Sequence, residues 1–288
     1  MNNKKLVATC CVLACSACAC YVGAANCAPS AVSGSPAPSA GALPPGHVRV
    51  ATYNVVHGTR FPLPPSLVRE SVVQGNLRAI GQWLHAEQPL VVALQETDHG
   101  RRNNRAESIA RYGQFAYWAD DASVSGHTPR HGVALLSTAA LQEPISKPLV
   151  RGATHDKGWV AATVTVDAWG GEPLRVVALH LDPFSARARE RQVDQLVAEL
   201  ESQQMPVVVL GDFNCGWEQG RCVQRLASRL GLHAAPTQGC PTYAFLGMHR
   251  NLDWILVSSD LEVAASYVSR DSYSDHRPVV AELARREK

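Results

Sequence analysis

Short runs rich in valine, isoleucine and leucine recur from residue 47 onward, and most of them stop abruptly at a polar residue. Such runs are typical of buried β-strands. Because amphipathic segments separate the runs and no repeat of fixed period is present, the pattern predicts one α/β domain with two packed β-sheets flanked by helices. The predicted strands are Val48–Asn54, Leu90–Leu94, Gly132–Ser137, Val160–Val166, Leu174–Leu179, Val207–Leu210, Leu252–Val257 and Val279–Leu283.

Two segments have the apolar periodicity of helices. The first follows the stretch PLPPS and covers residues 68–84, with Ser66 as its expected N-cap. The second begins at Ser185 and repeats apolar residues at i, i+3, i+4 and i+7 over Val193–Leu200. These spacings predict two amphipathic helices that each bury one face.

The first 25 residues predict a signal peptide. Lys4 and Lys5 precede an apolar run that reaches about Ala25 and ends in small residues such as Gly23 and Ala24. A transmembrane anchor is the alternative, because the run approaches the roughly 20 residues needed to span a bilayer. We therefore expect an exported protein, either periplasmic or extracellular.

Residues 26–46 carry no charge and are rich in proline, serine and alanine. This composition predicts a semi-extended linker between the signal peptide and a domain at 47–288. Two segments, Val12–Cys15 and Cys15–Cys18, resemble the bacterial lipobox, although each departs from it at one position. A membrane tether through an N-terminal lipid is therefore an alternative to simple export.

The predicted domain carries no net charge. The chain has 27 Lys plus Arg and 25 Asp plus Glu, and its first 46 residues contain Lys4 and Lys5 but no acidic residue. A neutral domain exerts no overall electrostatic attraction on nucleic acid.

Several predicted strands end or begin at a residue that can bind a metal ion or a phosphate. Each such residue alone has an ordinary structural explanation, for example an asparagine in a turn. Their presence at most of the strand ends indicates that one edge of the sheets gathers them into a single cleft. They are Asn54, Glu96, His180, Asp212, Asn214, Asp253, Asp275 and His276.

This set of side chains suits the hydrolysis of a phosphate ester. A carboxylate such as Glu96 can hold Mg²⁺, which takes oxygen ligands and keeps several waters. Imidazoles can transfer protons or donate to developing negative charge, and each needs a carboxylate to fix its tautomer. Amides such as Asn54 and Asn214 can orient water or phosphate. We therefore expect Mg²⁺, or Mn²⁺, as the cofactor of an in-line attack by water.

Seven segments match a known family in order and spacing: TYNVVHG, ALQET, GVALLS, VVALHLD, VVLGDFN, LDWILVSS and SDHRPVVAEL. They resemble the endonuclease/exonuclease/phosphatase superfamily, which includes deoxyribonuclease I. The resemblance runs from Val48 to Leu283, and GDFN followed by SDH is its most specific part. It implies a four-layered α/β sandwich of two mixed sheets flanked by helices, divalent metal dependence, and cleavage of phosphodiesters or phosphomonoesters.

The resemblance also implies roles for the acidic and amide residues. Glu96 would be the principal Mg²⁺ ligand, with Asn54 beside it and Asp275 near the metal. Asp212 would position or deprotonate the attacking water. Asn214 would hold the scissile phosphate or a second metal.

The two histidines receive their roles in the same way. His180 would bind phosphate oxygens, and Asp253 would orient His276, which would serve as general base or as a phosphate contact. Deoxyribonuclease-like members carry an acidic residue that supports the first histidine, where this chain reads Gly132-Val133-Ala134. A deoxyribonuclease role is therefore the weaker expectation.

Two enzymatic functions stay open. The first is a monomeric, metal-dependent hydrolase of a phospholipid headgroup or another small phosphoester, and the second is a secreted Mg²⁺-dependent endonuclease or exonuclease. A binding module without catalysis is disfavoured by the complete polar set. Two groups of arginines could form basic walls for nucleic acid: Arg101, Arg102 and Arg105, and Arg187, Arg189 and Arg191.

The predicted domain contains three cysteines, Cys215, Cys222 and Cys240, so an exported chain can form one disulfide among them. We expect Cys222–Cys240 rather than Cys215–Cys222, because it encloses the longer loop and stabilises more in the chain-entropy model. A zinc site is disfavoured, because no pair of cysteines has the short zinc spacing.

Overall fold

The computed structural model describes residues 41–97, 104–125, 132–152, 156–218, 221–237 and 240–286. The predicted signal peptide, residues 1–25, and the predicted linker up to residue 40 lie outside the described residues. Within the described ranges, no helix has both the length and the hydropathy needed to cross a membrane.

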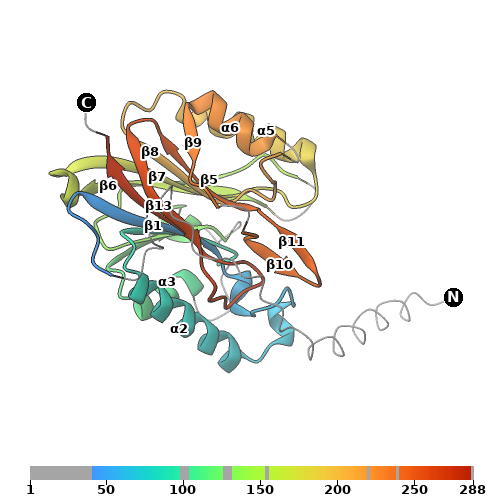
Figure 1. Ribbon diagram of the computed structural model, residues 1–288. Helices are drawn as coiled ribbons and strands as arrows, with labels where there is room; N and C mark the ends of the chain where they lie inside the picture. The colour runs from blue at the N-terminus through green and yellow to red at the C-terminus, as the bar shows by residue number, and fades with distance from the viewer. Residues whose placement is uncertain are drawn as a thin grey trace.

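Two six-stranded sheets lie at the centre of the protein (Figure 1). The first has the order β13 (Leu261–Val268), β14 (Val279–Arg285), β1 (His47–Asn54), β2 (Val91–Gln95), β4 (Ala134–Ser137) and β3 (Tyr117–Asp120). The second has the order β5 (Gln142–Pro148), β6 (Gly158–Val166), β7 (Glu172–His180), β8 (Val207–Asp212), β12 (Asp253–Ser258) and β9 (Leu232–Ala234). A separate hairpin joins β10 (Tyr243–Phe245) to β11 (Met248–Arg250).

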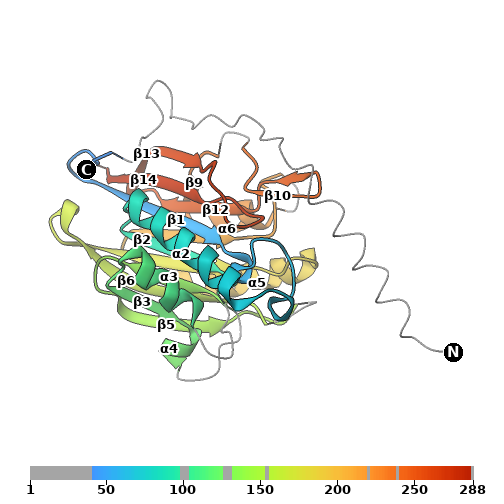
Figure 2. The same cartoon turned by 90° about the horizontal axis from the view of Figure 1, so that it is seen from below.

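Helices cover the outer face of each sheet (Figures 1 and 2). On the first sheet lie α2 (Glu70–Glu87) and α3 (Arg105–Gly113), and on the second lie α5 (Ala186–Leu200) and α6 (Cys222–Leu230). The remaining short elements are η2 (Val56–Gly58), η3 (Pro65–Leu67), α4 (Asp121–Ser125) and η4 (Asp167–Trp169). The order helix, sheet, sheet, helix confirms the predicted four-layered sandwich.

The inner faces of the two sheets form one apolar core. Val50 and Val91 from the first sheet join Val176, Val208 and Ile255 from the second in a single cluster, and all five are fully buried. Because strand side chains alternate between faces, the same strands also supply the apolar contacts beneath the helices. The runs are therefore nearly continuous in Val, Ile and Leu, as expected of strands buried on both faces.

Each sheet contains one parallel pair of neighbouring strands, β1 with β2 and β7 with β8. Parallel strands end at the same edge of a sheet, so each pair delivers two chain segments to one place. In β8, Gly211 lets the backbone approach β7 closely. It has a φ of 155°, and a Cβ atom there would lie 2.1 Å from the carbonyl oxygen of Leu179.

The helix predictions are correct in position, but one cap is wrong. Ser185 caps α5 as expected, because its side chain accepts a hydrogen bond from the amide of Ala188. Ser66 does not cap α2; it lies in η3, and α2 begins at Glu70 after Arg69, which makes no side-chain capping bond. The proline-rich segment forms its own turn, which delays the helix by about one turn.

A buried ion pair connects β1 to β14 and to the end of α2. The guanidinium of Arg49 donates to Glu282 Oε1 through Nη2 at 2.6 Å and to the carbonyl of Glu87 through Nη1 at 2.6 Å. The Arg49 side chain is 2% exposed and that of Glu282 is 10% exposed.

We predict that Glu282→Leu lowers the free energy of unfolding by about 3–5 kcal/mol, because it leaves the Arg49 charge buried without its carboxylate. The matched control is Asp194→Leu, which breaks the surface pair with Arg225. It should change the free energy of unfolding by less than about 1 kcal/mol. Denaturant unfolding of the three proteins measures both values. Equal effects of the two substitutions would contradict the prediction.

Candidate active site

The predicted polar strand ends lie together at one edge of the two sheets. Asn54 ends β1 opposite Gln95, the last residue of β2 and the neighbour of Glu96. In the second sheet, Asp212 at the end of β8 lies opposite both His180 and Asp253. The register of five strands therefore sets the positions of these side chains.

Asn54 connects the two sheets at this edge. Its Nδ2 donates to Glu96 Oε1 at 3.1 Å and to Asp212 Oδ2 at 3.0 Å, and its Oδ1 accepts from the amide of Val56 at 3.1 Å. The residue is 1% exposed. A single amide therefore holds a carboxylate of each sheet.

Asp212 is the carboxylate on which most of the other groups converge. Its Oδ2 lies 3.5 Å from His180 Nε2 and 3.8 Å from His276 Nε2, and its Oδ1 accepts from the amide of Asn214 at 2.8 Å. Burial raises the pKa of Asp212 to about 7, and the charge of Asp253 adds to the rise, whereas His276 and the Asn54 hydrogen bond oppose it.

Asp253 orients His276. His276 Nδ1 lies 2.8 Å from Asp253 Oδ2, which also accepts from the hydroxyl of Thr242 at 2.6 Å. The ring of Tyr243 packs on the imidazole, with centroids 4.9 Å apart. Burial acts to lower the pKa of His276, but the charges of Asp253 and Asp212 outweigh it and raise the pKa to about 10.

His180 lies between Asp212 and a lysine. The ammonium of Lys157 is 3.3 Å from Nδ1 and 3.2 Å from Nε2 of this imidazole, which is buried at the end of β7. Asp212 is thus an acidic neighbour of His180, although the segment Gly132–Ala134 carries none. An acidic neighbour of this histidine therefore comes from the adjacent strand β8.

Glu96 and Asp275 form the more open side of the site. Glu96 follows β2 with a φ of 57°, and its Oε2 lies 3.2 Å from His57 Nε2. Asp275 accepts from the hydroxyl of Ser274 at 3.2 Å. Burial raises the pKa of Asp275; His276 opposes this rise, and the negative charge of Glu96 adds to it.

Asn214, the remaining predicted residue, lies beside the cluster, where its side chain bonds the backbone after β7. Its backbone has a φ of 50°, and its Nδ2 donates to the carbonyl of Leu181 at 3.0 Å. In this arrangement its backbone amide, rather than its side chain, contacts Asp212.

The donor atoms fit a divalent cation. Among the described residues, ligand atoms of Asp212, Asp253 and His276 lie within 4.8 Å of one another, and the buried Oδ1 of Asp253 has no hydrogen-bond partner. The predicted ligand Glu96 is joined to this cluster through Asn54. Asp212 and Asp253 therefore provide carboxylate oxygens of the kind Mg²⁺ prefers, and Glu96 lies next to them on the other side of Asn54.

Sequence reasoning missed His57 and Lys157. His57 follows β1 and lies three residues after Asn54, and Lys157 directly precedes β6. For Lys157 a signal was present, because the chain has only two lysines between residues 47 and 286, Lys147 and Lys157. Lys147 pairs with Glu199 on the surface, and Lys157 contacts His180.

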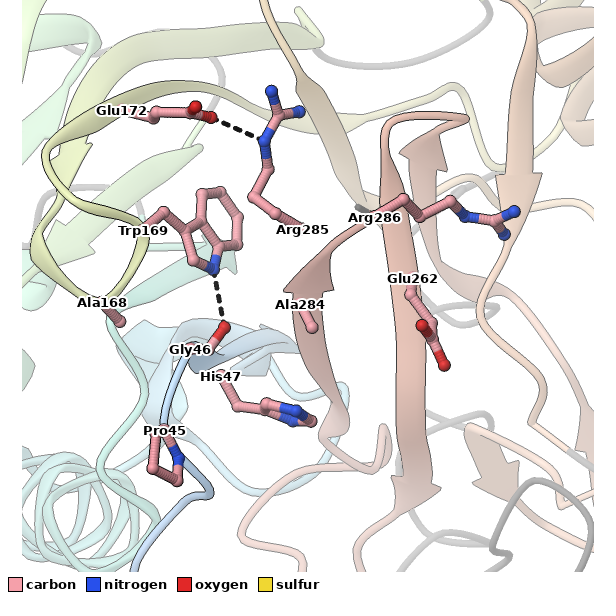
Figure 3. Close-up of a pocket in the computed structure, with 10 residues that line it drawn as sticks. All are labelled: Pro45, Gly46, His47, Ala168, Trp169, Glu172, Glu262, Ala284, Arg285 and Arg286. Atoms are coloured by element: carbon pink, nitrogen blue, oxygen red, sulfur yellow. Dashed lines mark hydrogen bonds and ion pairs between the residues drawn. The ribbon is translucent and has the colours of Figure 1, made fainter. Parts of the chain in front are cut away.

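A cavity of about 690 Å³ lies at the opposite end of β1 and plays no part in this site (Figure 3). His47 lines it at the start of β1, whereas Asn54 ends the strand. Trp169 donates through Nε1 to the carbonyl of Gly46 at 2.9 Å, so the last residue of the predicted linker packs against the domain.

The disulfide prediction is wrong. Cys215 is bonded to Cys222, and Cys240 lies buried outside the bond. Cys240 belongs to the apolar cluster between the sheets, whereas Cys215 and Cys222 belong to the cluster beneath α5 and α6. Proximity in the folded chain, not loop length, therefore decides the pairing.

With this geometry established, the comparison with protein families identifies the fold. The sequence profile described as "Endonuclease/Exonuclease/phosphatase family" matches residues 51–276. The chain belongs to this family. The match contains every residue of the predicted site, from Asn54 to His276, and confirms the predicted resemblance. No curated relative matches the chain in sequence.

Solved structures share the fold at low sequence identity. An endonuclease/exonuclease/phosphatase from Bacteroides vulgatus superposes with a TM-score of 0.68 at 17% identity, covering 83% of this chain and 99% of that one. The human Nocturnin catalytic domain superposes with a TM-score of 0.62 at 20% identity, covering 84% of this chain and 95% of that one. A mannosyl-6-phosphatase from Bacteroides thetaiotaomicron superposes with a TM-score of 0.65 at 16% identity, covering 82% of this chain and 99% of that one. At these identities the likeness establishes the fold alone.

Proposed function

We propose that this protein is a metal-dependent hydrolase of phosphate esters that acts on a small molecule or a phospholipid headgroup. The observation that carries the proposal is the convergence on Asp212 Oδ2 of the Asn54 amide and of the His180 and His276 rings, all within 3.8 Å. Membership of a family that contains nucleases and phosphatases supports the same reaction class.

The protein's own groups can perform the proton transfers of such a reaction. Asp212 is placed to orient the attacking water and take its proton, because it is the carboxylate that both imidazoles face. His276, held by Asp253, is placed to donate toward the phosphate oxygens as negative charge develops. Lys157 and His180 supply a second donor group on the other side of Asp212.

The cation would be held by Glu96 and Asn54, with Asp275 beside them. When bound, it would polarise the phosphoryl oxygens and stabilise their charge in the transition state. The excess of carboxylates over cationic groups in the cleft supports this assignment, because such a cluster is stabilised by a divalent cation.

A nuclease function receives no added support from the described residues. Arg105, expected to form a basic wall, is 5% exposed and lies inside α3, while Arg101 and Arg102 lie outside the described residues. Arg187 is exposed and Arg189 donates to the carbonyl of Asp182 at 2.8 Å. Among the described residues, the arginines expected to form basic walls therefore give no support to duplex binding, which rests on cationic groups that neutralise phosphates.

Export, with or without an N-terminal lipid, is part of the proposal. The supporting observation is the Cys215–Cys222 disulfide, because disulfides persist in oxidising compartments such as the periplasm and the extracellular space. We infer that the protein works there as a monomer.

We predict that Glu96→Gln, Asp212→Asn and His276→Ala each lower kcat by at least about 10²-fold, because each removes a proton-transfer or metal-binding group. Matched surface controls are Glu199→Gln, Asp194→Asn and His85→Ala, which should keep kcat within about twofold. The assay offers plasmid DNA, RNA, phospholipid vesicles and a generic phosphodiester and phosphomonoester. Near-normal activity in two of the three site variants would contradict the site.

We predict that EDTA abolishes hydrolysis and that Mg²⁺ or Mn²⁺ restores it, because the carboxylate cluster requires a cation to bind an anionic phosphate. Titration of the chelated protein with each metal measures the restoration. Full activity in excess chelator would rule out metal dependence.

We predict that Lys157→Met lowers kcat/KM by about 10-fold to 10²-fold, because it removes the cation next to His180. Lys147→Met is the control, since that lysine pairs with Glu199 on the surface and should have no effect. Lys157→Arg should restore part of the loss. Equal rates for the two methionine variants would show that Lys157 has no role in the reaction.

A further inference from the structure

A second cavity, of about 430 Å³, lies next to the cluster formed by Asp212, Asp253 and His276. Asn214 lines it, and the backbone amide of Asn214 bonds Asp212 at 2.8 Å. A group in this cavity is therefore close enough to be attached to the phosphate that Asp212 faces. The volume lies within the range of about 300–1,000 Å³ found for small-molecule sites.

One wall of the cavity is aromatic and held in place by the fold. Trp217 and Trp254 both line it, with ring centroids 5.6 Å apart at 47°. The ring of Trp254 is held in its orientation, because its Nε1 donates to the carbonyl of Cys215 at 2.9 Å. The Cys215–Cys222 disulfide closes the segment that carries Trp217. This wall is therefore largely formed before a ligand binds.

The rest of the lining combines the apolar side chains of Pro183, Pro241 and Leu252 with polar side chains, including His249, that donate and accept hydrogen bonds. Arg189 and Arg250 supply only donors, Glu218 supplies only acceptors, and Asn251 supplies both. Hydroxyl groups are the ligand groups that suit such a lining, because each one donates and accepts. The apolar faces of a saturated ring would then pack on Trp217.

Other ligand groups fit this lining less well. An acyl chain would cover the charged groups of Glu218 and Arg250 without pairing them, at about 1–3 kcal/mol or more for each group left unsatisfied. A second phosphate would meet the two arginines but also the like charge of Glu218. A ring with several hydroxyl groups satisfies both the aromatic wall and the charged groups.

We propose that this cavity binds the alcohol portion of the phosphoester, and that this alcohol is a saturated ring carrying several hydroxyl groups, such as a sugar or a cyclitol. The proposal rests on the proposed hydrolase function, because it names the substrate class of that same site. Trp217 and Arg250 determine the specificity, through ring packing and hydroxyl recognition.

The test measures how well four phosphate monoesters inhibit hydrolysis of a generic nitrophenyl phosphate ester. Glucose 6-phosphate and myo-inositol 1-phosphate carry hydroxylated rings, whereas hexyl phosphate and phenyl phosphate do not. Inhibition constants are measured against 4-nitrophenyl phosphate or bis(4-nitrophenyl) phosphate, and tryptophan fluorescence reports binding directly. We expect at least one hydroxylated ring to bind about tenfold tighter than hexyl phosphate, and the better of the two identifies a sugar or a cyclitol.

Variants then assign the effect to the cavity. Trp217→Ala and Arg250→Gln should each weaken binding of the preferred ring about tenfold and should weaken hexyl phosphate less, while Trp217→Phe should retain most of the affinity. Arg225→Gln is the matched control, because Arg225 pairs with Asp194 on the surface. Thermal melts verify that each variant is folded.

Two results would overturn the inference: tighter binding of hexyl or phenyl phosphate, or an equal loss for all four ligands in Trp217→Ala. Failure of the proposed hydrolase function would give a different result. The protein would then cleave neither generic ester in the presence of Mg²⁺ or Mn²⁺. In that case the fluorescence titrations still decide whether the cavity selects hydroxylated rings.

Discussion

The face-to-face packing of the two sheets is the interaction on which the rest of the structure depends. Val50 and Val91 of one sheet and Val208 and Ile255 of the other share one buried cluster, which fixes how the sheets lie on each other. Each sheet also contains one parallel strand pair. The packing therefore brings the end of β1 next to the end of β8, where the Asn54 amide reaches a carboxylate from each sheet.

In the proposed function, this arrangement places the reacting groups and the substrate-selecting groups on different parts of the fold. The strand ends hold buried groups such as Asp212 and Asp253, whose positions follow from the register of β8 and β12. The segment after β8 and the β10–β11 hairpin carry groups of the second cavity, Trp217 and Arg250 respectively. Under the proposed function, changes in those segments would alter the group bound in the second cavity while the Asp212 cluster stays the same.

The sequence predicted the eight long buried strands, because runs of Val, Ile and Leu have few other structural solutions. It missed β3, β5, β9, β10 and β11, which are short or exposed. It also missed β13, where a register shift between Val263 and Ala265 interrupts the pattern. Lys157 was missed because a lone lysine before a strand is ordinarily a surface residue.

By itself the sequence determined the sandwich and the identities of the strand-end residues, since hydrophobic periodicity and motif spacing are local properties. Only the tertiary structure decided which of them touch. It placed Asp212 beside both His180 and His276, and it bonded Cys215 to Cys222 while Cys240 lies between the sheets. The physical reason is that contacts between distant segments depend on sheet register and on how two apolar faces pack, neither of which is encoded within a single segment.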